Sequence, residues 1–217
     1  MKVFLEVITA PKNVFTQIKS LPTWKGAFFA VVGGNSLLTW LKSCLRGSSF
    51  VADFIILIGS FIISAIVIFV LWSTVALFLH SLSLLFNSQK RGNYKNIFSL
   101  VSNCGVIYLV GEILNFILSE FDLVRNNAYL LPNRFPIGLD ILFIGRHPGL
   151  PLSIILYSIN PITIWYLATL SSGLSFISHI DRTRAWIASL CLWAFGVGFI
   201  VILAQLLGGT SMGFKVG

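Results

Sequence analysis

Charged residues are scarce in this chain. They make up 10% of its 217 residues, and only seven of these are acidic, whereas a soluble domain carries about 25% charged residues. So little charge excludes a water-soluble globular domain. Hydrophobic residues account for 56% of the chain, and its mean hydropathy is +0.90, values typical of an integral membrane protein.

Catalytic and metal-binding patterns are also missing. The chain has no glycine-rich phosphate loop, GxSxG, HExxH or paired-cysteine motif, which excludes the enzymes those motifs identify. Its three cysteines are scattered and mostly lie in apolar runs, which favours packing roles over disulfides or metal ligation. The three histidines do not build a metal site with Glu112, because none of them lies at its predicted depth in the membrane. We therefore expect no metal, no cofactor and no enzymatic activity.

Two apolar runs near the C-terminus indicate how the chain is organised. They cover 154–177 and 185–207 and are joined by a short polar bend at 178–184 with two arginines. A helix of about 23 residues spans roughly the 30 Å of a bilayer core. The pair therefore predicts a membrane hairpin, and the arginines place its turn in the cytoplasm.

Three further apolar runs precede this hairpin. The sequence predicts an all-α integral membrane protein, a five-transmembrane-helix bundle over 26–217. The five predicted helices lie at about 26–45, 54–86, 97–118, 153–177 and 184–207. The long connection at 119–151, rich in Asn, Pro and Gly, is then an external loop.

Residues 1–25 contain four lysines and one acid. Within them, four apolar residues recur at helical spacing, Pro11 suits a first turn, and Pro22 ends the segment. This predicts a short amphipathic helix at the cytoplasmic interface. Its apolar side chains would pack on lipid or on the bundle: Val14, Phe15, Ile18 and Leu21. A partly ordered tail is the alternative.

The net charge of +8 would suggest nucleic-acid binding in a soluble chain, but here the cations lie in tails and loops. A cytoplasmic N-terminus places nine Lys and Arg against two acids on the inner side, and six against four on the outer. Anionic lipid is therefore the expected partner, and nucleic acid is not. Eight of these cations form the predicted basic rim: Lys12, Lys19, Lys25, Lys90, Arg91, Lys95, Arg182 and Arg184.

Glu112 is the only acid well inside an apolar run. An ionised carboxylate at that depth costs several kcal/mol, so Glu112 should face the bundle and be paired or protonated. Counting from the outer helix ends predicts a polar layer of Thr39, Ser60, Glu112 and Asn160. Pro161 would leave a carbonyl free beside this layer. The layer either joins helices or forms a substrate, ion or proton site. His80 and Asn103 lie at similar depth near the inner face and could pair.

Several stretches resemble the Yip family of Ypt/Rab-interacting membrane proteins, in particular its compact bacterial-type members. They extend over nearly the whole chain: APKNVF at 10–15, RGNYKNIFSLV at 91–101, NPITIWYL at 160–167, GL at 173–174 and RAW at 184–186. The resemblance implies five transmembrane helices with a cytoplasmic N-terminus, in a bacterial inner membrane. Eukaryotic members bind small GTPases through a longer cytoplasmic domain. Only about 25 residues precede the first predicted helix here, so we do not expect a GTPase partner.

These observations favour a Yip-like binding or organising module without catalysis. The basic rim would contact anionic lipid or a protein partner, and a homo-oligomer is possible. A small transporter, channel or lipid-translocating protein that uses the Glu112 and Asn160 layer is the alternative. A wet cavity joining Glu112 to one face would favour transport, whereas a dry layer would favour a scaffold.

Overall fold

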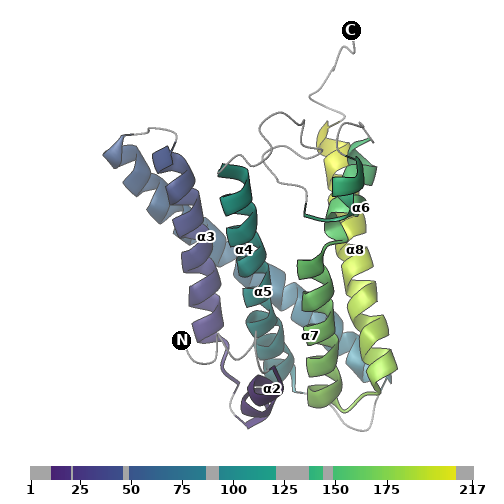
Figure 1. The fold of residues 1–217 in the computed structure, drawn as a ribbon. Helices are drawn as coiled ribbons and strands as arrows, with labels where there is room; N and C mark the ends of the chain where they lie inside the picture. Colours follow the sequence, from purple (N-terminus) through teal and green to yellow (C-terminus); the bar gives the residue numbers. More distant parts are fainter. Residues whose placement is uncertain are drawn as a thin grey trace.

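The computed structural model describes residues 11–20, 22–45, 49–86, 93–120, 137–143 and 149–208. These residues form helices, turns and short connections, with no strand among them, which confirms the predicted all-α class. The elements in Figure 1 are α2 (Pro11–Ser20), α3 (Lys25–Leu45), α4 (Phe50–Phe86), α5 (Tyr94–Glu120), η1 (Leu139–Phe143), α6 (Leu150–Ser158), α7 (Pro161–Ser178) and α8 (Arg182–Gly208).

Four single helices are long and apolar enough to cross a membrane, namely α3, α4, α5 and α8. The sequence predicts one further helix over 153–177, whereas the structure has two helices there, α6 and α7, bent by 57°. Counting the bent pair as one span gives the predicted five. Pro161 explains the break, because proline has no N–H to donate and its ring crowds the preceding turn.

α5 lies at the centre and packs against α2, α3, α4 and α7. Glycines allow close approach on two of its sides. A Cβ on Gly34 of α3 would lie 2.6 Å from Leu109 Cδ1, and one on Gly105 of α5 would lie 2.5 Å from Trp72 of α4. Without a hydrophobic driving force in lipid, such close van der Waals contacts hold helices together.

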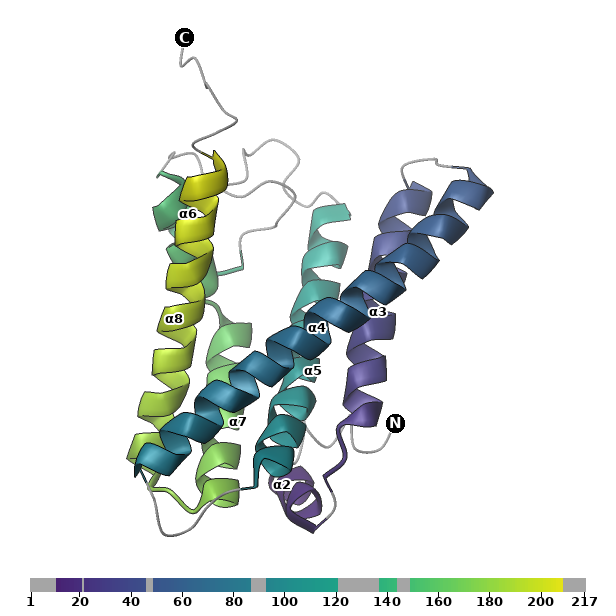
Figure 2. The ribbon, with the colours of Figure 1, turned by 180° about the vertical axis from the view of Figure 1, so that it is seen from behind.

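α4 is 37 residues long, and Figure 2 shows it crossing α5 obliquely from the α3 side to the α8 side. Its sequence contains no proline to interrupt it. Near its start, Asp53 is buried and accepts a hydrogen bond from Ser43 Oγ of α3 at 2.7 Å. A carboxylate in the first turn is also favoured by the helix dipole, so Asp53 connects the C-terminal end of α3 to the start of α4.

The predicted amphipathic helix is confirmed as α2. Val14, Phe15 and Ile18 are buried at 1%, 4% and 0% exposure, so the apolar side packs on the bundle. Lys12 and Lys19 are exposed on the opposite side. Leu21, the fourth predicted apolar residue, lies outside the described residues.

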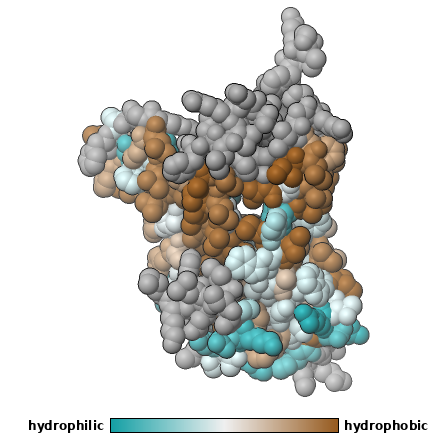
Figure 3. Space-filling view, in the orientation of Figure 1, coloured by the Kyte–Doolittle hydropathy of each residue, from teal (hydrophilic) through white to brown (hydrophobic). Residues whose placement is uncertain are grey.

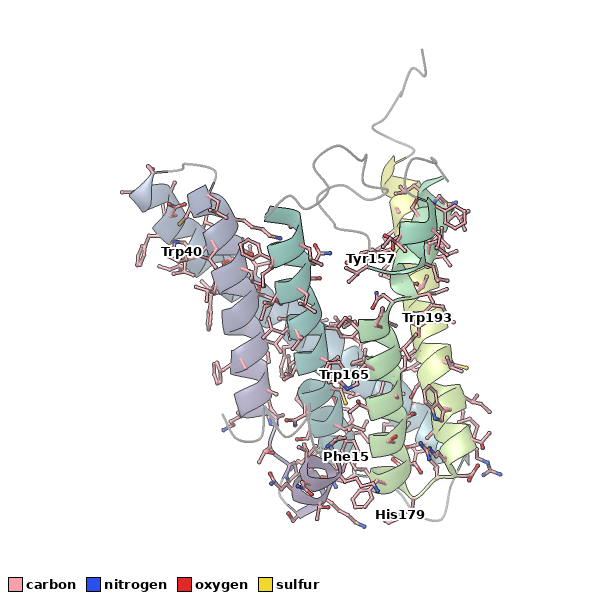
Figure 4. The ribbon with its side chains drawn as sticks, viewed as in Figure 1. Phe15, Trp40, Tyr157, Trp165, His179 and Trp193 are labelled. Atoms are coloured by element: carbon pink, nitrogen blue, oxygen red, sulfur yellow. The ribbon has the colours of Figure 1, made fainter. Side chains whose placement is uncertain are left out.

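Two groups of contacts hold α2 against the bundle. The Phe15 ring lies 6.4 Å from that of Phe176 on α7, and Lys19 Nζ lies 3.2 Å from Nε2 of His179 at the end of that helix. On the other side, Asn103 of α5 donates to the Thr23 carbonyl between α2 and α3 at 2.9 Å. Figure 4 shows Phe15 and His179 together at this end of the bundle, which we call the α2 end.

Gly173 of α7 is expected to be essential for docking α2. A Cβ there would lie 2.3 Å from Leu100 Cδ1 and 2.8 Å from Phe15 Cε1. Overpacking of this kind costs about 1–3 kcal/mol. We expect Gly173→Leu to raise the rate at which a cysteine at Val14 reacts with a maleimide by roughly tenfold, in a background without the native cysteines. Gly33→Ala is the control, because no atom lies within 4 Å of its added Cβ. Equal labelling of both variants would contradict this docking.

Candidate functional site

The break between α6 and α7 is built around the side chain of Asn160. Its backbone is extended (φ −136°, ψ 162°), and its Oδ1 accepts from the Thr163 N–H at 2.8 Å as the N-cap of α7. Its Nδ2 donates to the Tyr157 carbonyl at 2.9 Å. Backbone groups in a membrane must find partners within the protein. Asn160 therefore supplies one partner to each of the two helix ends that Pro161 separates.

The C-terminal end of α6 is closed by η1, which comes from the predicted external loop. Leu139 donates its N–H to the Ile159 carbonyl at 3.1 Å. Gly138 lies so close that an added Cβ would be 2.8–2.9 Å from three carbonyl oxygens. Asp140 Oδ1 accepts from the Gly138 N–H at 2.8 Å. Burial raises the pKa of the Asp140 carboxyl, and the nearby backbone N–H groups oppose that shift.

Polar side chains of α5 meet this break. Asn115 Nδ2 donates to the Tyr157 hydroxyl of α6 at 3.2 Å. The Tyr108 ring of α5 and the Tyr166 ring of α7 lie 4.5 Å apart. These contacts connect α5 to both halves of the broken span, and Figure 4 shows Tyr157 at the level of the break.

Glu112 lies on the same side of α5, one turn from Tyr108 and three residues from Asn115, and it is half-buried. Its neighbour Gly111 packs on Ile162 of α7, with 2.9 Å between an added Cβ and Ile162 Cγ2. Ile113 and Leu114 are exposed on the outer side at 38% and 44%. On its own side of α5, Tyr108 is 43% exposed and Asn115 is 3% exposed. That Glu112 faces the bundle, and that it belongs to a polar layer, both stay predictions.

Thr39 and Ser60, the other members of the predicted layer, lie on α3 and α4. The Thr39 hydroxyl donates to the Asn35 carbonyl at 2.9 Å and is exposed, and the Ser60 hydroxyl donates to the Leu57 carbonyl at 3.0 Å. Both donors are used within their own helices. The hydrogen bonds at the break come from other residues, on α5, α6 and α7.

The basic rim forms a second candidate site. Six of its members are exposed and belong to elements that meet at the α2 end in Figure 1: Lys12, Lys19, Lys25, Lys95, Arg182 and Arg184. Figure 3 shows hydrophilic residues along this end, below an apolar belt. Arg184 also donates to the Phe86 carbonyl at 2.9 Å, which ties α8 to the end of α4. Lys90 and Arg91 lie outside the described residues.

The sequence indicated the Tyr157 carbonyl as the group freed by Pro161, and Asn160 Nδ2 donates to it. Sequence reasoning missed the Tyr157 hydroxyl and four other residues at the break, namely Tyr108, Asn115, Thr163 and Gly138. Asn115 lies three residues from Glu112, and Tyr108 four, so helical spacing could have indicated both. The proposed pairing of His80 with Asn103 is wrong. Asn103 donates to the Thr23 and Ser99 carbonyls, and His80 Nδ1 is buried without a hydrogen-bond partner.

The two candidate sites have different chemistry. Among the described residues, no three His, Cys, Asp or Glu side chains are placed to hold a metal ion. The break offers one carboxyl, phenol hydroxyls and amides, which can form hydrogen bonds with a bound ligand. The rim offers exposed cations, which suit anionic headgroups.

We expect loss of the Asn160 cap to destabilise the bundle. Asn160→Ala removes both hydrogen bonds and should lower the free energy of unfolding by about 1–2 kcal/mol. Asn160→Ser retains a capping oxygen and should cost less. Thermal unfolding in detergent would measure this, with Thr39→Ala as a control that removes a bond within one helix. If Asn160→Ala lowers the stability no more than Thr39→Ala does, the Asn160 cap does not stabilise the junction between α6 and α7.

One of the comparisons with known proteins identifies a family. The Yip1 domain matches residues 5–205, which include all the helices described above except the last residues of α8. Comparisons with curated proteins and with solved structures found no match. The Yip1 match covers nearly the whole chain, and the helices are long and apolar enough for several membrane crossings. This chain is therefore an integral, multi-pass membrane protein that belongs to the Yip family.

Proposed function

We propose that this protein is a non-catalytic organising module of the membrane whose basic rim binds anionic lipid headgroups. The proposal is carried by α2, whose apolar side is buried in the bundle while Lys12 and Lys19 are exposed. Docking fixes these lysines on a rigid end that also presents Lys25 and Lys95. Cations that are already positioned bind with a smaller loss of conformational freedom.

The charge balance of the α2 end supports an anionic ligand. Asp181 is the one exposed acid among the described residues that lie there, next to Arg182. Each Lys or Arg near an anionic leaflet contributes about 1 kcal/mol, screened by salt. The same charges would also suit the acidic surface of a protein partner, including a second copy of this chain. The lipid test below distinguishes that alternative from lipid binding.

The proposed orientation follows from the same charges. An N-terminus in the cytoplasm places the α2 end against the inner leaflet, where the positive-inside rule puts Lys and Arg. The proposed location is the bacterial inner membrane. The break between α6 and α7 then lies within the membrane, nearer its outer face.

The break favours a second candidate function, a small transporter, channel or lipid-translocating protein. Discontinuous helices with polar side chains at membrane depth form substrate sites in transporters. Figure 3 shows hydrophilic atoms within the apolar belt at this level, beside a hollow in the surface. Transport at the break requires that its polar side chains contact a substrate. Binding of anionic lipid by the basic rim does not require such a contact.

Removing rim cations should weaken binding of anionic lipid. We expect Lys12→Gln, Lys25→Gln and Lys95→Gln to lower the affinity for short-chain phosphatidylglycerol roughly fivefold per cation at low salt. Native mass spectrometry of the purified protein measures retained lipid. Lys42→Gln, a matched loss of charge at the other end of α3, is the control. Equal lipid binding by the triple variant and the wild type would overturn the proposal, and selective loss of a co-purified protein would assign the rim to a protein partner.

A further inference from the structure

We propose that the inward side of α5 at the break binds a small organic ammonium group, carried by a free amine or by a lipid headgroup. The residues that carry this proposal are Glu112 and Tyr108. It deepens the second candidate function by giving the class of ligand, and binding does not depend on whether that ligand is moved across the membrane.

The first step is the direction of the Glu112 side chain. Successive side chains of an α-helix are rotated by about 100° about the helix axis. Glu112 therefore points about 100° away from Gly111, which packs on α7. It points only about 20° away from Gly105, which packs on Trp72 of α4. Outward positions such as Ile117 are 42% exposed. The carboxyl is therefore directed between α7 and α4 and is only half-buried.

The second step is the aromatic neighbour. Tyr108 and Glu112 are four residues apart on one helix, which brings their Cβ atoms to about 5–6 Å. Tyr108 is 43% exposed, while its partner Tyr166 is 7% exposed. One side of the Tyr108 ring lies against Tyr166, with centroids 4.5 Å apart. A substantial part of Tyr108 thus stays accessible beside the carboxyl.

The third step selects the ligand. A carboxyl within an apolar span favours a cation and disfavours an anion. Calcium or magnesium would need about six oxygen ligands, and the described residues contain no group of three His, Cys, Asp or Glu suited to a metal. An ammonium group needs fewer partners, because one carboxylate neutralises it and an aromatic ring stabilises it by a cation–π interaction.

Contacts with α6 and α7 hold this side of α5 in place. The Tyr108 ring packs on Tyr166 of α7, and Asn115, two turns along α5, donates to the Tyr157 hydroxyl of α6. Figure 3 shows hydrophilic residues beside a hollow within the apolar belt.

The test uses the whole protein in nanodiscs without amine lipids and measures heat on titration with ethylammonium or tetramethylammonium chloride. We expect saturable binding that Glu112→Gln weakens at least tenfold. Tyr108→Leu should also weaken binding, while Tyr108→Phe retains the ring and most of the affinity. Potassium chloride at equal concentration supplies a cation without an organic substituent and should give no saturable heat. Ser60→Ala, on α4, is the matched control and should bind as the wild type does.

A second arm distinguishes the source of the ammonium group. Native mass spectrometry would compare retention of phosphatidylethanolamine with that of phosphatidylglycerol, in the wild type and in Glu112→Gln. Selective loss of phosphatidylethanolamine from the variant assigns the site to a headgroup, and binding of free amines alone assigns it to a solute. No binding in either arm, or equal binding by Glu112→Gln, would overturn the proposal. If Glu112→Gln unfolds, equal binding by Tyr108→Leu and the wild type would overturn it.

Discussion

The Asn160 side chain is the interaction on which the broken span depends. Pro161 removes a backbone donor and bends the chain by 57°, which leaves helix-end groups that water cannot reach. One amide satisfies an N–H of α7 and a carbonyl of α6. With η1 on the Ile159 carbonyl, the bend becomes a stable feature of the bundle. The polar contacts of α5 with both helices follow from this geometry.

Close packing of α5 provides the rest of the framework. Gly34, Gly105 and Gly111 each lie where an added Cβ would come within 3 Å of a neighbouring side chain. These contacts bring α3, α4 and α7 onto three sides of one central helix. Gly173 extends the same principle to α2, because Phe15 occupies the space beside it. The rigid bundle therefore carries the basic rim at one end and the polar break in its interior.

The helical class, the several membrane crossings and α2 were predictable, because apolar run length and helical spacing report them directly. The 57° bend was harder to predict, since a proline in a membrane helix produces anything from a mild kink to a full break. The prediction that Thr39 and Ser60 lie in one polar layer with Glu112 relied on depth alone, and it stays a prediction. Depth does not give the direction of a side chain, and both hydroxyls bond within their own helices. The contribution of η1 lies in a long connection whose sequence has no helical period.

The claim that α7 packs directly on α5 at the break is tested most directly by a disulfide. A Cβ on Gly111 would lie 3.6 Å from the Ile162 Cβ, within the range that a disulfide requires. In a background without native cysteines, Gly111→Cys with Ile162→Cys should cross-link rapidly in membranes under mild oxidation. Gly111→Cys with Ile155→Cys, on the outer half of the broken span, should not. Cross-linking of the second pair but not the first would contradict this packing.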